Sequence, residues 1–255
     1  MTREFVAEFD PELVVVFAPD HMNMLSRVRA PFTAVLSGRT LAEFGIPEFP
    51  LGVRGAVAAE LCRRLVERDV DVAVAEDVQV DHGMGLTLVQ LFDDPAAVPL
   101  LPVVVNAIGF PLPPVRRALA FGTAVGEVLA DLPERVLFVG TGGLSHHPPF
   151  PPAAPGAVRL TPEQRKDHLA TAAGYIDPEW DRELLSHVEQ GDPSWLAGLT
   201  QAELDTRGCG ANEVRVWAAA WAACGSPPAS TTDYEPVPEW ITGMGVAYGR
   251  ARAVV

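Results

Sequence analysis

Three of the six histidines in this 255-residue sequence lie at or shortly after the ends of candidate strands, where imidazole chemistry is expected. They are His21 after residues 13–18, His82 after residues 70–74 and His146 after residues 135–139. These runs are short, mostly apolar and rich in β-branched residues, which is typical of buried strands. Because ligand-binding groups of open α/β sheets gather beyond the carboxyl ends of the strands, the three histidines are predicted to converge on one crevice. Imidazoles there could bind a metal ion or transfer protons near neutral pH.

Two of these histidines also fit a purely structural role when each is considered alone. His21 fits a turn in which it pairs with Asp20, and His82 fits the same role beside Asp81. Only their combination with further groups therefore indicates a functional site.

The segment Gly142–Pro148 and Glu213 complete a candidate iron site. Glycines let the backbone approach a ligand closely, and two adjacent histidines before prolines, His146 and His147, are not typical of core packing. Glu213 alone fits the first turn of a helix, where the helix dipole favours a carboxylate. Two histidines and one carboxylate together hold Fe(II) and leave positions open for substrate and O2. The remaining histidines would then serve as acid and base.

The overall composition restricts the class of protein. The net charge of −14 argues against nucleic acid as a partner, because phosphate binding requires a concentrated basic face. No apolar run reaches the roughly 18 residues that a membrane span needs, so no membrane partner is predicted. The three cysteines are odd in number and lack CxxC spacing. They favour a reducing, cytoplasmic location over a disulfide framework or a zinc ribbon.

The order of the predicted elements indicates an α/β fold. We expect one domain over residues 1–255, with a mainly parallel or mixed central sheet and helices on both faces. The predicted strands are residues 13–18, 70–74, 98–105 and 135–139, and the predicted helices are residues 57–66, 115–129, 162–173, 178–189 and 212–224. The proline-rich residues 148–155 are predicted to end the sheet region. The chain from about residue 160 is expected to be helical, with a loop over residues 225–238.

Four motifs follow one another along nearly the whole chain. They are Pro11–His21 (PELVVVFAPDH), Val80–Gly83 (VDHG), Arg135–His146 (RVLFVGTGGLSH) and Pro238–Ile241 (PEWI). In this order they resemble the class III (LigB-type) extradiol ring-cleavage dioxygenases, and among them the group that acts on 2,3-dihydroxyphenylpropionate. The resemblance implies a LigB-like fold and an enzyme that opens a catechol ring with O2 in the breakdown of aromatic compounds. It also implies Fe(II) as cofactor, a small aromatic diol and O2 as partners, and a homo-oligomer.

The resemblance further implies roles for individual residues. In the family, the histidine that ends the Pro-Asp-His motif and a late glutamate bind the iron, which implies His21 and Glu213 as metal ligands. The histidines of Asp-His-Gly and Gly-Gly-Leu-Ser-His are acid–base groups, which implies catalytic roles for His82 and His146. The residues that resemble supporting or substrate-binding positions are Asp20, Asp81, His147 and Pro148.

One ligand of the family has no counterpart among these residues. The first iron ligand of the family is a histidine in a Ser-His-Ser-Pro-like segment before the Pro-Asp-His motif, and no histidine precedes His21 here. Three explanations stay open: a protein that starts earlier than this sequence, a replacement ligand such as His147 or Asp20, or a homologue that has lost iron binding.

Two other functions stay open beside the dioxygenase. A non-catalytic LigB-type homologue that acts as a binding protein would keep the fold without tight iron binding. A zinc-dependent hydrolase would use His21, His82 and His146 around a metal-bound water, although no HExxH spacing occurs. For a dioxygenase, the side chain of the substrate is open. A carboxylate on it would require a cation, and the candidates are Arg29, Arg54 and Arg116.

Overall fold

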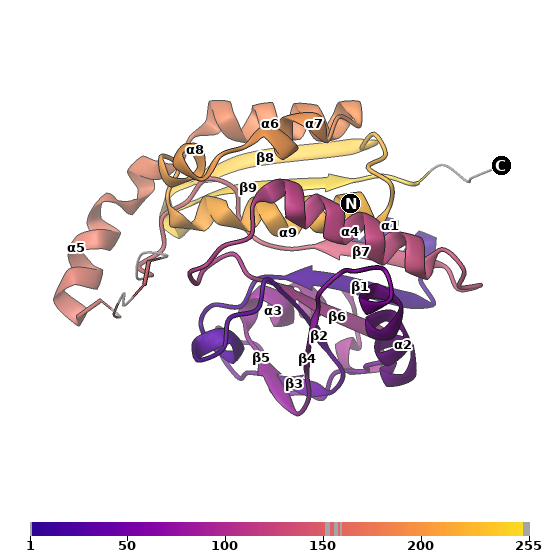
Figure 1. The fold of residues 1–255 in the computed structure, drawn as a ribbon. Coiled ribbons are helices and arrows are strands. Elements are labelled where there is room, and N and C mark those ends of the chain that lie inside the picture. Colours follow the sequence, from indigo (N-terminus) through magenta and orange to yellow (C-terminus); the bar gives the residue numbers. More distant parts are fainter. Residues whose placement is uncertain (1, 151–153, 156–157, 159, 252–255) are drawn as a thin grey trace.

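The computed structural model describes residues 2–150, 154–155, 158 and 160–251. Its centre is a five-stranded sheet in the order β4-β2-β6-β1-β7, with helices on both faces (Figure 1). Its strands are β1 (Leu13–Ala18), β2 (Phe32–Val35), β4 (Ala73–Ala75), β6 (Leu100–Val105) and β7 (Val136–Gly140). Strand β1 runs parallel to β6 and β7, β2 runs parallel to β4, and β2 and β6 are antiparallel. The predicted α/β fold with a mixed sheet is confirmed.

The other elements cover this sheet or extend from it. The helices are α1 (Thr2–Phe9), α2 (Gly55–Val66), α3 (His82–Leu91), α4 (Val115–Leu129), α5 (Pro162–Ala172), α6 (Pro178–Gln190), α7 (Ser194–Gly198), α8 (Gln201–Asp205) and α9 (Val214–Ala223). Short 3-10 helices are η1 (Met24–Ser26), η2 (Pro95–Ala97), η3 (Ala173–Tyr175), η4 (Cys209–Glu213) and η5 (Pro238–Trp240). Two small sheets pair β3 (Gly38–Thr40) with β5 (Val78–Val80), and β8 (Thr231–Val237) with β9 (Thr242–Tyr248). Within the described ranges no helix is long and apolar enough to cross a membrane.

Strand β1 separates two hydrophobic cores. All six of its residues are apolar and buried, and successive side chains point to opposite faces of the sheet. The odd-numbered residues pack with α2, α4 and α9. The even-numbered residues pack with α3 and β5. A strand that is buried on both faces has a continuous apolar sequence, which explains why its position could be predicted.

The strand predicted at residues 70–74 was wrong in position. Strand β4 covers residues 73–75 at the edge of the sheet, while Val70 and Val72 pack against the core from the connection after α2. The strand that leads into His82 is instead β5, which pairs with β3 outside the central sheet. Val70 and Val72 are apolar because they pack against the core, and such burial occurs in strands as well as in irregular segments that cover a core.

The sequence predicts a helical chain from about residue 160, but the structure also contains strands in this part. Residues 225–238, predicted to be a loop, include strand β8, which forms an antiparallel hairpin with β9. The sequence of β8 is polar, and its residues are half-buried or exposed, so it lacks the apolar alternation of a typical strand. The hairpin packs on α6, where Tyr234 donates a 2.7 Å hydrogen bond to the buried Asp181.

Helices α4 and α9 pack closely because small residues face one another. Gly122 and Gly126 of α4 lie against the backbone of Ala219 and Ala223 in α9. The bare glycine surfaces let the two helices approach more closely than larger side chains would allow. Helix α9 also packs on β7. This packing fixes the start of α9 and with it the position of η4, which directly precedes it. This helix pair lies along one face of the sheet (Figure 1).

We expect Gly122→Ala to lower the free energy of unfolding by about 2 kcal/mol, because the added methyl group would collide with the carbonyl of Ala219. Urea unfolding followed by circular dichroism would measure the change. The control is Gly198→Ala in α7, where an added Cβ meets no atom within 4 Å. Equal stability of the two variants would contradict the close packing of α4 on α9.

Candidate active site

The loop after β1 carries the first of the predicted site residues. Asp20 is buried, and its carboxylate accepts hydrogen bonds from the backbone N–H groups of Asn23, Met24 and Leu25 at 2.8–3.1 Å. Burial, together with the charge of Asp81, raises the pKa of Asp20. Both oxygens of Asp20 are therefore used to shape the loop, which fixes the direction in which His21 leaves the strand.

His21 is held between two carboxylates. Its Nδ1 lies 3.1 Å from Asp81 Oδ1, and its Nε2 lies 3.2 Å from Glu213 Oε1. The backbone N–H of His21 also donates to Asp81 Oδ2 at 2.6 Å. Burial works to lower the pKa of His21, but the hydrogen bonds and charges of Asp81 and Glu213 outweigh it and raise the pKa to about 10. The surroundings of this imidazole thus strongly favour a positive charge.

Glu213 reaches the site from η4, directly before α9. Its side chain is buried, and Oε2 accepts a 2.7 Å hydrogen bond from the backbone N–H of Gly143. Gly142 has a positive φ of 111°, and a Cβ there would lie 2.6 Å from Glu213 Oε2. Burial works to raise the pKa of Glu213, but His146, His21 and the Gly143 amide lower it. The carboxylate is therefore ionised in the interior, where it needs a cationic partner.

His146 faces the same carboxylate from the loop after β7. Its Nδ1 lies 2.8 Å from the carbonyl oxygen of Leu144, and its Nε2 lies 3.8 Å from Glu213 Oε1. Because a carbonyl only accepts hydrogen bonds, this contact assigns a proton to Nδ1. Nε2 is then the ring nitrogen that faces Glu213 and the rest of the site.

His82 begins α3 and stacks on His21, with ring centroids 4.2 Å apart and planes at 10°. Its Nδ1 lies 2.8 Å from Glu43 Oε1, which also accepts the backbone N–H of His82 at 2.7 Å. Glu43 thus orients His82, and Phe44 packs edge-on against the ring. The sequence analysis missed Glu43, because an isolated glutamate far away along the chain gives no signal of such a contact.

His147 and Pro148 lie beside this group without facing its centre. The ring of His147 packs against His168 and Tyr175, and its Nδ1 accepts a 3.0 Å hydrogen bond from the Cys209 N–H. The carbonyl of Pro148 accepts from the Cys209 thiol at 3.3 Å. The structure therefore places Asp20, His147 and Pro148 around five other predicted residues. These five form the histidine cluster: His21, Asp81, His82, His146 and Glu213.

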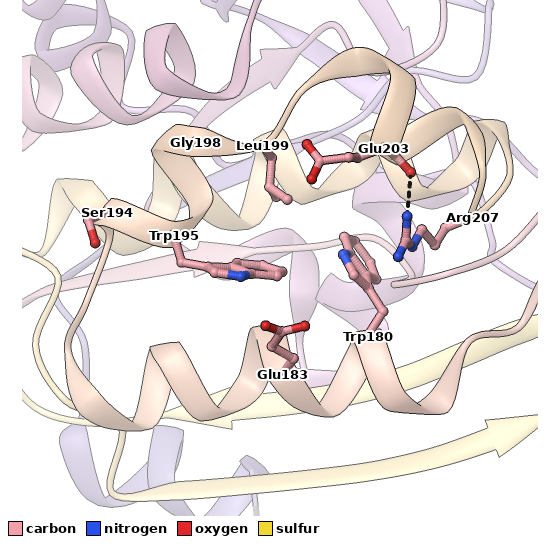
Figure 2. Close-up of a pocket in the computed structure, with 8 residues that line it drawn as sticks. All are labelled: Trp180, Glu183, Ser194, Trp195, Gly198, Leu199, Glu203 and Arg207. Atoms are coloured by element: carbon pink, nitrogen blue, oxygen red, sulfur yellow. Dashed lines mark hydrogen bonds between the residues drawn. The ribbon is translucent and has the colours of Figure 1, made fainter.

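A separate cavity of about 370 Å³ lies between α6, α7 and α8 (Figure 2). Two indoles form its walls, with the ring centroids of Trp180 and Trp195 5.9 Å apart, and Arg207 lies over Trp180. The other lining residues are Glu183, Ser194, Gly198, Leu199 and Glu203. None of these residues belongs to the histidine cluster, so the cavity is not part of the candidate active site.

Comparison with known proteins identifies the family. Residues 1–245 match the family described as the catalytic LigB subunit of aromatic ring-opening dioxygenase. The chain belongs to this LigB family.

Several curated relatives of this LigB chain are named 2,3-dihydroxyphenylpropionate/2,3-dihydroxicinnamic acid 1,2-dioxygenase. One from Mycolicibacterium gilvum is 38% identical over 279 aligned residues, covering 96% of this chain and 86% of the relative. One from Rhodococcus jostii is 36% identical over 273 residues, covering 96% and 87%. One from Burkholderia vietnamiensis is 37% identical over 282 residues, covering 99% and 88%. The resemblance inferred from the four motifs is confirmed.

The donor set of this LigB chain fits a divalent metal ion. Nε2 of His21 and Oε1 of the ionised Glu213 face one another in a buried site that favours positive charge, and a metal ion there would take the place of the proton on His21 Nε2. Asp81 holds the opposite nitrogen of His21, an arrangement that is common behind metal-binding histidines. The ligating atoms of His21, Asp81 and His82 also lie within 4.8 Å of one another. Asp81 is the less available ligand, because its oxygens already accept the backbone N–H groups of His21 and Gly83.

Neither candidate for a replacement ligand faces the pair of His21 and Glu213. Asp20 uses its carboxylate in the loop after β1, and His147 uses Nδ1 in its contact with Cys209. This geometry disfavours both residues as the further metal ligand.

We expect Asp81→Asn to weaken the binding of a divalent metal ion, tested with Fe(II), about 10- to 100-fold, because the amide no longer supplies the charge that orients and polarises His21. An anaerobic Fe(II) titration against a competing chelator would measure the affinity. Asp192→Asn, a change at an exposed turn beside α7, serves as the control. Unchanged affinity in a folded Asp81→Asn variant would contradict the proposed support of His21.

The stability of the protein should fall as the pH decreases from about 6.5 to 4, partly because of His147. Burial, with a smaller contribution from the charges of His168 and His146, lowers the pKa of His147 to about 4. The folded state then binds this proton more weakly than the unfolded chain, so the contribution of His147 is complete above pH 6.5 and decreases below it. Urea midpoints at pH 7 and pH 4.5 should differ less in His147→Gln than in the wild type. If the urea midpoint changed equally between the two pH values in both proteins, the lowered pKa of His147 would be refuted.

Proposed function

We propose that this protein is an extradiol dioxygenase that opens the ring of a catechol with O2, using Fe(II) bound by His21 and Glu213. The observation that carries this proposal is the buried contact between His21 and Glu213, flanked by two histidines whose Nδ1 atoms are held by Glu43 and by the Leu144 carbonyl. Bound Fe(II) would supply the coordination of the catechol oxygens and of O2 that this chemistry requires. The names of the relatives support a substrate of the 2,3-dihydroxyphenylpropionate class.

His82 and His146 would carry the protons of the reaction. Each ring has its Nδ1 held by an acceptor, the carboxylate of Glu43 for His82 and the carbonyl of Leu144 for His146. Each therefore presents Nε2 for proton transfer. One histidine would accept the proton of a substrate hydroxyl, and the other would deliver a proton during ring opening.

The two other functions receive less support. The relatives are named as dioxygenases and match nearly the whole chain, which disfavours a role restricted to binding. A zinc hydrolase would need His21, His82 and His146 around one ion, but His82 stacks face to face on His21. The homo-oligomer, the cytoplasmic location and iron as the particular metal stay predictions.

Oxygen uptake would test the proposed function. Protein loaded anaerobically with Fe(II) should consume O2 in the presence of 2,3-dihydroxyphenylpropionate and form a yellow, ring-opened product. Zinc-loaded protein is the matched control and should consume none. Absence of uptake with every catechol of a panel, in folded and iron-loaded protein, would refute a dioxygenase.

We expect His82→Ala and His146→Ala each to lower kcat about 100- to 10,000-fold, a loss of about 3–5 kcal/mol in transition-state stabilisation. Steady-state oxygen uptake at saturating iron would measure it. His187→Ala is the control, since His187 stacks on Trp195 in the α6 region outside the histidine cluster. Full activity of either the His82 or the His146 variant would remove that residue from the mechanism.

A further inference from the structure

Arg29 is a half-buried cation without an acidic partner among the described residues. Its Nε is buried and has no hydrogen-bond partner in this part of the chain. Its only hydrogen bond to the described residues is a long one of 3.3 Å, from a terminal nitrogen to the carbonyl of Phe110. A guanidinium has five N–H donors, and leaving them unpaired away from water is costly. Arg29 thus has unused capacity to bind an acceptor.

The position of Arg29 is built by the loop after β6. The side chain of buried Asn106 accepts from the N–H groups of Ile108 and Gly109 and donates to the carbonyls of Gly109 and Pro111. These bonds fix the loop against which Arg29 packs. A Cβ on Gly109 would lie 2.7 Å from Arg29 Cδ and 2.9 Å from its Nε. Glycine at this position therefore makes room for the arginine.

This guanidinium lies at the same edge of the sheet as the histidine cluster. Strands β1 and β6 are parallel neighbours, so the residues that follow each of them emerge side by side. Met22, next to His21, places its sulfur 3.2 Å from the same Cβ position of Gly109. Glu213 approaches from the opposite side of β1, through α9 and β7. Arg29 and Glu213 therefore lie on two sides of the loop that follows β1.

The other two arginines that could bind a carboxylate are placed less favourably. Arg54 lies 3.6 Å from Glu134, and its backbone N–H binds the carbonyl of Leu100, where β6 begins. It is therefore at the opposite edge of the sheet. Arg116 is exposed in the first turn of α4. Among these three arginines, only Arg29 is half-buried, lacks an acidic partner among the described residues and lies at the carboxyl ends of β1 and β6.

We propose that Arg29 binds the carboxylate on the side chain of the substrate and selects anionic catechols over neutral ones. This inference rests on the proposed function. With the two ring hydroxyls at His21 and Glu213, the side chain of the substrate would extend past the loop after β1 toward the guanidinium, which packs on the loop after β6. Nε and a terminal nitrogen then donate to the two carboxylate oxygens as a bidentate pair. The Arg29–carboxylate contact satisfies the orphaned Nε.

The test compares two ligands that differ in one charge, 2,3-dihydroxyphenylpropionate and the neutral 3-propylcatechol. Their affinities for iron-loaded protein are measured by calorimetry without O2, and kcat/KM is measured with O2. Wild-type protein should prefer the carboxylate about 10- to 100-fold. Arg29→Gln should remove this preference and leave 3-propylcatechol unchanged. Arg116→Gln, the matched control, should behave as the wild type does. Arg29→Lys keeps the charge without the fork and should retain only part of the preference.

Each outcome decides between the two proposals. Equal affinity of the wild type for both ligands, or a preference that survives in Arg29→Gln, overturns the role of Arg29 while turnover still supports the dioxygenase. A preference that depends on Arg29 without any oxygen uptake supports the carboxylate site and refutes the proposed reaction. If Arg29→Gln does not fold, the wild-type comparison and Arg29→Lys decide the question.

Discussion

The contact between His21 and Glu213 is the interaction on which the site depends. An ionised carboxylate in a protein interior is costly unless a cation and hydrogen bonds compensate it. Glu213 obtains both, from His21 and from the Gly143 amide, and Asp81 completes the series on the far side of His21. The surplus of negative charge around one imidazole makes this a place where a proton or a metal ion is stabilised. Metal binding and the integrity of the loops are thereby coupled.

The fold brings these groups together through the carboxyl ends of parallel strands. His21 follows β1, and Gly142 and Gly143 follow β7. Because these strands are parallel neighbours, the three residues lie at the same end of the sheet. Glu213 arrives differently, because it precedes α9, whose close packing on α4 and β7 determines its depth. A change in the small residues between α4 and α9 would therefore displace a site residue that is distant in sequence.

The two candidate proton carriers are oriented by different means. A carboxylate holds Nδ1 of His82, whereas a backbone carbonyl holds Nδ1 of His146. The two histidines thus have different electrostatic surroundings at one site. Such a difference is what an acid–base pair with two separate roles requires.

The sequence by itself predicted the α/β class, the buried strands β1 and β6 and the helix α4, and it named the five residues that the structure brings together, whose roles stay predictions. The strands could be predicted because burial on both faces leaves an apolar run, and His21 and His146 could be named because ligand-binding groups gather at strand ends. Strands β5 and β8 were not predicted, because short or half-exposed strands show no periodic pattern of apolar residues. Only the tertiary structure decided that Glu43 orients His82, that Asp20 and His147 use their polar atoms elsewhere, and that the buried Nε of Arg29 has no hydrogen-bond partner among the described residues. Each of these is a contact between residues far apart along the chain, and a contact depends on distance in space.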